Sequence, residues 1–292
     1  MNLLLALLSA SAHSMSNVSM RMYQTRLQKS TADLRLFQMV NSFLTSLAYL
    51  ILSVFALELD LYGCMLALCY GVSLSATSIT VAACFACGPM SVTSVISNAC
   101  VVLPIAVGCI WYDEVMTAPQ IVGCILLAAT FVLSALNPKE ARGEIALKWY
   151  PLAFLAFFCN GLGAVLLNIY GRIAGAGERN SFLTLGYFTA ALIFLANYGL
   201  MARKTGPVAV KGFLRPLLLG LILMASMGGF IGNGLLMSLN TAMPASILYP
   251  LVNGGIAVIV AIASCVIFRE KLTVQRLLTI LVGLGAIVAL NS

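Results

Sequence analysis

The chain has 292 residues, of which 61% are hydrophobic and only 9% are charged. A soluble domain usually carries about 25% charged residues, so this composition excludes a water-soluble globular protein of this size. The formal net charge of +7 arises from basic residues that lie between apolar runs, where they set orientation in a membrane. No basic face with interleaved aromatic residues is present, so a nucleic-acid partner is not expected.

Ten apolar runs follow one another along the chain, and each is long enough to cross a hydrocarbon layer about 30 Å thick as a helix. A transmembrane β-barrel would show alternating strands of about ten residues instead. The expected fold class is therefore an all-α polytopic membrane protein with ten transmembrane helices. The predicted helices span residues 2–21, 36–57, 61–86, 90–112, 118–136, 149–171, 181–201, 213–240, 244–268 and 272–290.

The first run resembles a secretory signal peptide, because Leu3 to Leu8 is followed by Ala10-Ser11-Ala12, which has Ala-x-Ala cleavage spacing. Only Met1 and Asn2 precede the run, so the positively charged segment of a signal peptide is missing. We expect this segment to be the first transmembrane helix, although its removal by cleavage stays open.

The longest polar connection divides the chain into a first half of five helices (residues 1–137), a connecting loop (138–148) and a second half of five helices (149–292). The two halves have matching features. In each, a long apolar run ends in an acidic residue and then Thr, at Trp111–Thr117 and at Ile267–Thr273. Tyr23 and Tyr170 both follow the first helix of their half, and aligning them places His13 opposite Asn160. We therefore predict an internal repeat.

The loops after predicted helices 1, 3, 5, 7 and 9 contain 14 of the 16 Lys and Arg residues, and the other loops contain only Arg172 and Arg179. The positive-inside rule then predicts that these basic loops are cytoplasmic and that both termini are extracytoplasmic, in a bacterial plasma (inner) membrane. Because five helices per half is an odd number, the two halves must be inverted with respect to the membrane. Inverted repeats are typical of alternating-access carriers, which bind substrate near the midplane between the repeats.

The five-plus-five layout and the last 50 or so residues resemble the drug/metabolite transporter superfamily, specifically its EamA-like members. The stretch Phe268–Arg276, followed by Gly283-Leu284-Gly285, is similar to the Glu-Arg/Lys-Leu-Thr motif and Gly-rich last helix of that family. Ala245-Ser246 at the start of helix 9 also fits, whereas a Trp-Gly pair that the family often has in helix 1 is missing. The resemblance implies a central cavity lined by helices 1, 3, 4, 6, 8 and 9.

Polar residues within the predicted helices are the candidate substrate-binding residues, because polar groups in a membrane are costly and usually face a cavity or a partner. For each of them the alternative is a hydrogen bond between helices. The candidates are His13, Asn17, Tyr70, Ser78, Asn98, Asn160, Tyr187, Asn233, Tyr249 and Asn253.

No Asp, Glu, Lys or Arg lies near the middle of a predicted helix, which argues against strongly cationic and strongly anionic substrates. The sequence therefore predicts a secondary transporter that moves a small neutral or zwitterionic, amino acid-like metabolite by alternating access. Protons are a candidate coupling ion, since His13 is the only histidine and titrates nearest to neutral pH. Import or export, and a monomer or a dimer, stay open.

Two alternative substrates remain: a quaternary ammonium compound or drug held by the aromatic faces of Tyr70, Tyr187 and Tyr249, and a lipid or lipid precursor that is flipped between leaflets. An enzyme is not expected, because one His and no intramembrane carboxylate do not supply a catalytic pair. No cofactor or metal is expected either, since Cys84-x-x-Cys87 has no second Cys pair to complete a site and His13 is the only histidine. The lipid bilayer and a small-molecule substrate are the expected partners.

Overall fold

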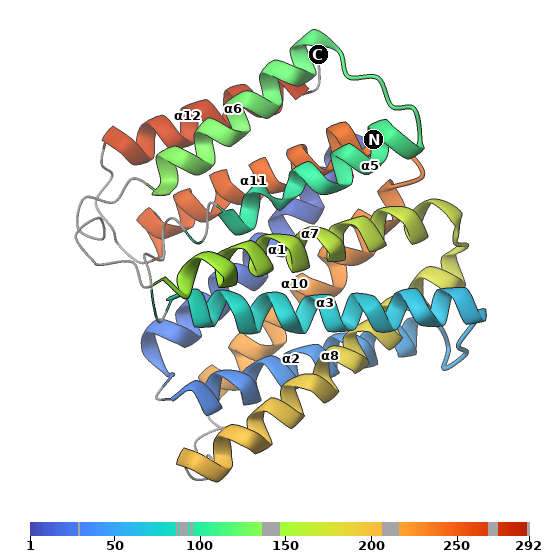
Figure 1. Ribbon diagram of the computed structural model, residues 1–292, viewed down its shortest axis with the longest axis vertical. Helices are drawn as coiled ribbons and strands as arrows, with labels where there is room; N and C mark the ends of the chain where they lie inside the picture. Colours follow the sequence, from blue (N-terminus) through green and yellow to red (C-terminus); the bar gives the residue numbers. More distant parts are fainter. Residues whose placement is uncertain are drawn as a thin grey trace.

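The structure is a computed structural model, and it describes residues 1–28, 30–85, 87, 93, 96–135, 147–205, 216–267 and 274–290. Throughout these ranges the regular structure is helical and no strand is present. Figure 1 shows the helices lying roughly side by side in one bundle. They are α1 (Asn2–Arg26), α2 (Thr31–Leu52), α3 (Leu61–Phe85), the 3-10 turn η1 (Ala99–Val101), α5 (Val102–Trp111), α6 (Ala118–Ala135), α7 (Trp149–Ile173), α8 (Ala176–Thr205), α10 (Pro216–Leu239), α11 (Ala245–Val266) and α12 (Val274–Leu290).

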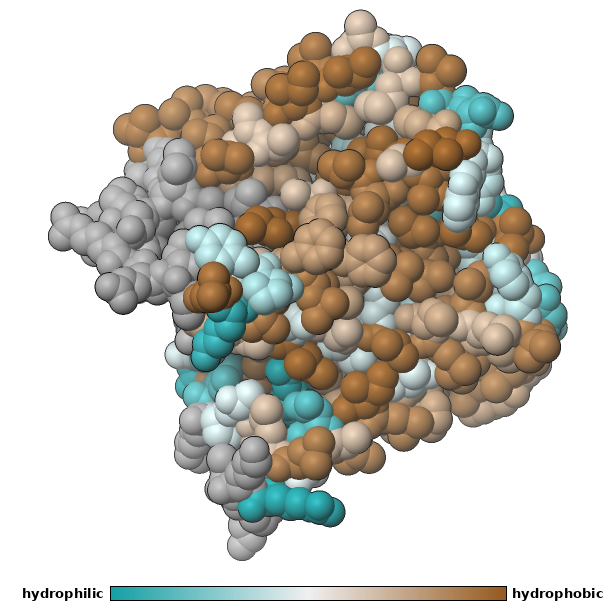
Figure 2. All heavy atoms as spheres, in the orientation of Figure 1, coloured by the Kyte–Doolittle hydropathy of each residue, from teal (hydrophilic) through white to brown (hydrophobic). Residues whose placement is uncertain are grey.

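Seven of these helices are long and apolar enough to cross a membrane, namely α1, α2, α3, α7, α8, α10 and α11. Three further apolar stretches are shorter, at Ile96–Trp111, Ala118–Leu133 and Ile280–Leu290. Hydrophobic side chains cover most of the face drawn in Figure 2, as lipid contact requires. The chain is therefore a helical, multi-pass membrane protein, which confirms the predicted class at this level.

Helix α2 begins five residues earlier than predicted, because a capping box starts it at Thr31. The Ser30 hydroxyl accepts a hydrogen bond from the Asp33 backbone N–H at 3.1 Å, and the Asp33 carboxylate accepts one from the Ser30 N–H at 2.9 Å. The helix ends at Leu52, before Val54 and Phe55 adopt positive φ angles, and not at residue 57. Arg35, which was predicted to lie in a loop, is therefore a helical residue and is 2% exposed.

Helix α1 continues to Arg26, five residues beyond its predicted end, and most of the other predicted boundaries lie close to those observed where the structure describes them. Helix α8 is longer than predicted and begins at Ala176, where the Glu178 carboxylate accepts a hydrogen bond from the Gly175 N–H at 2.6 Å. Most of the connecting loop, the motif at 268–273 and the first residues of the helices predicted at 90–112, 213–240 and 272–290 lie outside the described residues.

Helices of the first half pack mainly on helices of the second half. Helix α1 lies against α10 and α11, and α7 lies in the same way against α3 and α5. Helix α2 packs on α8 and α10, while α8 packs on α2 and α3. Figure 1 shows that α6 and α12 form one edge of the bundle and that α2 and α8 form the opposite edge. The centre of the bundle is therefore bounded by α1, α3, α5, α7, α10 and α11.

A stacked aromatic pair joins the first two helices of each half. The Tyr23 and Phe37 rings lie 4.3 Å apart between α1 and α2, with an interplanar angle of 19°. Tyr170 and Phe182 lie 4.7 Å apart between α7 and α8, also with an interplanar angle of 19°. The two tyrosines that sequence comparison matched thus have the same kind of partner in the two halves.

Glycines allow α1 and α10 to approach at backbone distance. A Cβ atom at Gly228 would lie 2.5 Å from the carbonyl oxygen of Ala12, and one at Gly232 would lie 2.8 Å from the His13 ring. Small residues at such crossings let helix backbones touch and gain van der Waals contact in a membrane. The Gly-rich segment of α10 is therefore a packing surface for α1.

We predict that Gly228→Ala lowers stability by about 1–3 kcal/mol, because the added methyl group must push α1 away. Gly220→Ala on the same helix is the matched control, since its Cβ would meet no atom within 4 Å and alanine favours helix by up to about 1 kcal/mol over glycine. Thermal unfolding of the detergent-solubilised protein measures both. An equal melting temperature for the two variants would contradict the packing role of Gly228.

Candidate substrate cavity

A cavity of about 410 Å³ lies in the centre of the bundle, within the range of about 300–1,000 Å³ that is usual for ligand sites. Its walls come from α1, α2, α3, α7, α8, α10 and α11 and from residues 98–101. All ten residues that the sequence analysis singled out line it, although their helices are far apart along the chain. Among the described residues that form its wall, none is Asp, Glu, Lys or Arg.

Helices α2 and α8 contribute to the wall as well, beyond the six helices that the family resemblance implied. Gln38, Asn41 and Ser42 project from α2, and Phe194 joins Tyr187 on α8. Sequence shows the α2 residues as polar positions in an apolar run. It does not indicate which face of α2 is turned toward the cavity. Packing of α2 against both α8 and α10 decides that face.

Asn233 on α10 is the centre of a buried polar cluster in this wall. Its amide nitrogen donates to the Tyr187 hydroxyl at 2.6 Å and to the Gly229 carbonyl at 3.2 Å, and its oxygen accepts from the Tyr70 hydroxyl at 3.4 Å. The rings of Tyr70 and Tyr187 meet edge to face, with centroids 6.2 Å apart. These three predicted residues therefore hold one another, and they present aromatic surface to the cavity.

Asn160 on α7 and Asn253 on α11 both line the cavity, and one hydrogen bond joins their helices about one turn away from each residue. The Tyr249 hydroxyl of α11 donates to the Ala164 carbonyl of α7 at 2.8 Å. The Asn160 amide nitrogen donates to the Ser97 carbonyl at 2.9 Å, and that of Asn253 donates to the Tyr249 carbonyl at 2.9 Å. Both partners are backbone carbonyls, so the amide orientation is determined and the side-chain oxygens are left for the cavity.

His13, Asn17, Ser78 and Asn98 are the predicted residues without a side-chain hydrogen bond in the described part of the protein, although each lines the cavity. Asn17 and Asn98 are exposed, whereas Tyr249 is 2% exposed. The exposed members belong to the end of the cavity where α1 finishes and α5 starts. The cavity is thus accessible from that end and closed near Tyr249.

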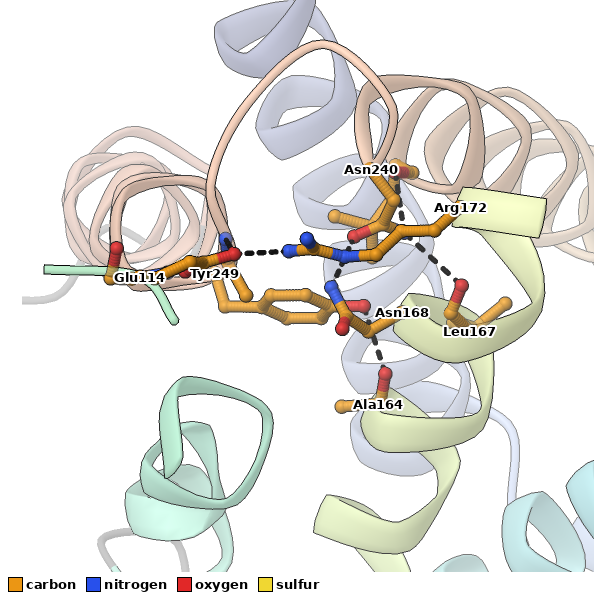
Figure 3. Close-up of polar contacts among 10 residues, drawn as sticks. Glu114, Ala164, Leu167, Asn168, Arg172, Asn240 and Tyr249 are labelled. Atoms are coloured by element: carbon orange, nitrogen blue, oxygen red, sulfur yellow. Dashed lines mark hydrogen bonds and ion pairs between the residues drawn. The ribbon is translucent and has the colours of Figure 1, made fainter. Parts of the chain in front are cut away.

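The closed end is built around Glu114, in the connection between α5 and α6. Its carboxylate accepts hydrogen bonds from the backbone N–H groups of Ala245 and Ser246, each at 3.0 Å, and forms an ion pair with Arg172 at the end of α7 (Figure 3). Because free N–H groups at a helix start favour an anion, Glu114 stabilises the beginning of α11. Gly108 provides the room, since a Cβ there would lie 2.6 Å from the carboxylate.

Arg172 also contacts Tyr112, the residue directly after α5. Its guanidinium lies 4.1 Å from the centroid of the Tyr112 ring, close enough for a cation–π interaction. Beneath it, the Asn168 amide donates to the Asn240 side-chain oxygen at 2.9 Å, and the Asn240 amide donates to the Leu167 carbonyl at 3.2 Å (Figure 3). The Glu114 contacts thus join the α5–α6 connection to α7 and α11, and the Asn168–Asn240 hydrogen bond separately joins α7 to α10.

The sequence carried one signal for this network, because Arg172 is a rare basic residue in loops that otherwise have almost none. Its partner could not be inferred, since 58 positions separate Arg172 from Glu114. Within the described ranges, no three His, Cys, Asp or Glu side chains gather as metal ligands would.

No protein-family model matches the chain, and no curated protein matches it in sequence. Twenty-eight chains of solved structures are similar in fold. One of them, described only as the crystal structure of a protein, covers 99% of this chain and 94% of its own length with a TM-score of 0.75. Its sequence identity is 11%, so the likeness concerns the fold alone.

The electrostatics of the closed end make its stability dependent on pH. Burial raises the pKa of the Glu114 carboxyl, but the hydrogen bonds from Ser246, Ala245 and Arg172 outweigh that effect and lower the pKa overall. A carboxyl with a lowered pKa stabilises the fold fully above its unfolded pKa of about 4.3, and this contribution is lost as pH falls through the folded pKa.

We predict that Glu114→Gln lowers the free energy of unfolding by about 1–3 kcal/mol at pH 7, because Arg172 loses its partner. The difference from the wild-type melting temperature should stay constant between about pH 8 and pH 5 and shrink below about pH 4. Asp113→Asn removes the neighbouring carboxylate, which is exposed, and serves as the control. Equal melting temperatures of Glu114→Gln and the wild type at pH 7 would contradict the role of this ion pair.

Proposed function

We propose that the protein is a secondary transporter that moves a small neutral or zwitterionic metabolite, such as an amino acid, across a bacterial plasma membrane by alternating access. The observation that carries the proposal is the central cavity of about 410 Å³, whose wall is polar but free of charged side chains. Such a wall offers hydrogen bonds but no charged group of its own, which suits a substrate of zero net charge. The cavity lies among seven helices able to cross a membrane.

The packing of the helices supports two inverted five-helix repeats, which are a hallmark of alternating-access carriers. Exchanging each helix for its counterpart in the other half converts the contacts of α1 with α10 and α11 into those of α7 with α3 and α5. The same exchange relates the α2–α10 contact to the α8–α3 contact. The stacked pairs Tyr23–Phe37 and Tyr170–Phe182 also correspond.

The two ends of the cavity differ in accessibility. This difference is expected of a carrier in one of the two states of alternating access, in which the site is open to one side of the membrane only. Glu114, Arg172 and Asn240 seal the end near Tyr249, whereas Asn17 and Asn98 are exposed at the other end. By the distribution of Lys and Arg, the sealed end is extracytoplasmic and the accessible end is cytoplasmic. In this proposal the conformation is inward-facing, and release of the Glu114 network accompanies outward opening.

The proposal includes membership of the drug/metabolite transporter superfamily, on the resemblance of the last helices to EamA-like members. The aromatic lining supports one alternative substrate class. Tyr70, Tyr187 and Tyr249 all border the cavity, and their ring faces could hold a quaternary ammonium group.

We predict that a screen of the purified protein against neutral amino acids, other small metabolites and quaternary ammonium compounds finds a ligand that raises its melting temperature. Asn160→Ala and Tyr249→Ala should weaken that ligand about tenfold or more, because each removes a polar group from the cavity wall. Ser238→Ala, at an exposed site outside the wall, is the control. Uptake of the ligand into proteoliposomes without ATP then tests transport, and retained affinity in both cavity variants would contradict the assigned site.

Proton coupling through His13 gives a separate prediction. The ring lies against Gly232 and lines the cavity without a side-chain hydrogen bond in the described residues, so it can exchange protons with cavity water. His13→Gln should abolish uptake driven by a pH gradient while substrate exchange at equal pH on both sides persists. Unchanged pH-driven uptake in this variant would remove His13 from the coupling mechanism.

A further inference from the structure

Arg35 is a buried cation beside the cavity. It lies on the second turn of α2, is 2% exposed, and its Nε atom is buried without a hydrogen-bond partner in the described part of the chain. Its Nη1 donates to the Gln38 side-chain oxygen at 2.7 Å. No carboxylate among the described residues forms an ion pair with it. A buried positive charge is costly unless an anion or strong acceptors compensate it, so the surroundings of Arg35 favour an anion.

Gln38 connects Arg35, whose surroundings favour an anion, to the cavity wall. An arginine can only donate hydrogen bonds, so the side-chain oxygen of Gln38 faces Arg35. The NH₂ group of Gln38 therefore lies on the other side of its amide. Gln38 lines the cavity, and its nitrogen has no partner among the described residues. The cavity therefore meets, on its α2 side, a donor that is polarised by a buried cation.

The α7 and α11 side of the cavity has the opposite polarity. The NH₂ groups of Asn160 and Asn253 donate to backbone carbonyls, which only accept, and the oxygens of both side chains accept no hydrogen bond from any described residue. Both residues line the cavity, each about one turn from the Tyr249–Ala164 hydrogen bond. Amide oxygens accept hydrogen bonds from a protonated amine, so this side favours a cationic group.

We propose that Gln38 binds a carboxylate of the substrate, that Arg35 positions and polarises Gln38 for this task, and that Asn160 and Asn253 accept hydrogen bonds from the substrate ammonium group. The proposal rests on the transporter function proposed above and deepens it. It makes Arg35 and Gln38 the residues that select substrates with a carboxylate, and it orients a zwitterion across the cavity from α2 to α7 and α11.

Gln38→Glu is the decisive variant, because it keeps the shape of the side chain and gives Arg35 a carboxylate partner, so that the fold is retained. The ion pair cancels the cation and replaces the donor at the wall with acceptors. Gln120→Glu makes the same chemical change outside the cavity wall and is the control. Arg35→Met removes the charge, and Arg35→Lys tests whether a conservative cation rescues it.

Binding is measured by thermal shift and counterflow with matched probes: L-serine, L-serine methyl ester and ethanolamine, and L-leucine, L-leucine methyl ester and isoamylamine. The wild type should prefer at least one amino acid over its ester and amine by about 10- to 100-fold, as expected for a charge-assisted hydrogen bond. Gln38→Glu should abolish or reverse this preference, and Arg35→Met should reduce it to about twofold. Arg35→Lys should retain part of it, and Gln120→Glu all of it.

The outcomes separate the two proposals. An unchanged ratio of amino acid to ester in Gln38→Glu overturns the carboxylate subsite, and so does a wild type that binds the esters or amines as tightly as the amino acids. Transport of quaternary ammonium compounds with no binding of any amino acid overturns the subsite and leaves the carrier function standing. If none of these probes and no compound of the metabolite screen is bound or transported, both proposals are wrong.

Discussion

Hydrocarbon offers no hydrogen bonds, so every polar group within the bilayer must find a partner in the protein or face an enclosed cavity. Many hydroxyl groups in this chain meet the requirement locally. Ser14 and Thr130, for example, donate to the carbonyl four residues earlier in their own helix, at 2.7 Å and 2.8 Å. Longer side chains meet it across helices, as Tyr249 does with Ala164. Other polar side chains, such as His13 and Asn17, have no side-chain hydrogen bond within the described residues and line the central cavity.

Close contact between helices brings the cavity-lining side chains together. Gly228 brings α1 against α10, and Gly71 on α3 lies at backbone distance from α8, where a Cβ would be 2.4 Å from the Gly186 carbonyl. These contacts join helices of different halves, so the cavity wall is shared between the halves. A movement of one half against the other would change the wall on both sides at once, as alternating access requires.

The Glu114 network acts on the same division. One carboxylate from the first half holds the start of α11 and the end of α7, both in the second half. All of these hydrogen bonds end on the two carboxylate oxygens of Glu114, so a movement of this one side chain would break them together. The proposed donor, Gln38, belongs to the first half, and the proposed acceptors, Asn160 and Asn253, belong to the second half. A zwitterion bound in the proposed way would therefore bridge the two halves.

Sequence alone determined the membrane class, most helix boundaries and ten of the residues that border the cavity, because these depend on local composition and on the cost of burying polar groups in lipid. His13, Asn160 and Asn233 could be named for that reason before any contact was known. The helical position of Arg35 could have been expected from the capping box at Ser30 and Asp33, but its burial and its contact with Gln38 could not.

Only the tertiary structure decided which end of each amide faces the cavity, which end of the cavity is sealed, and that Glu114 meets Arg172, Ala245 and Ser246. These features depend on partners as many as 132 positions apart in the chain. A periodic pattern of apolar residues carries no information about such pairs, because any inward-facing polar group would fit it equally well. Their choice follows from the packing of whole helices, which brings the two halves together.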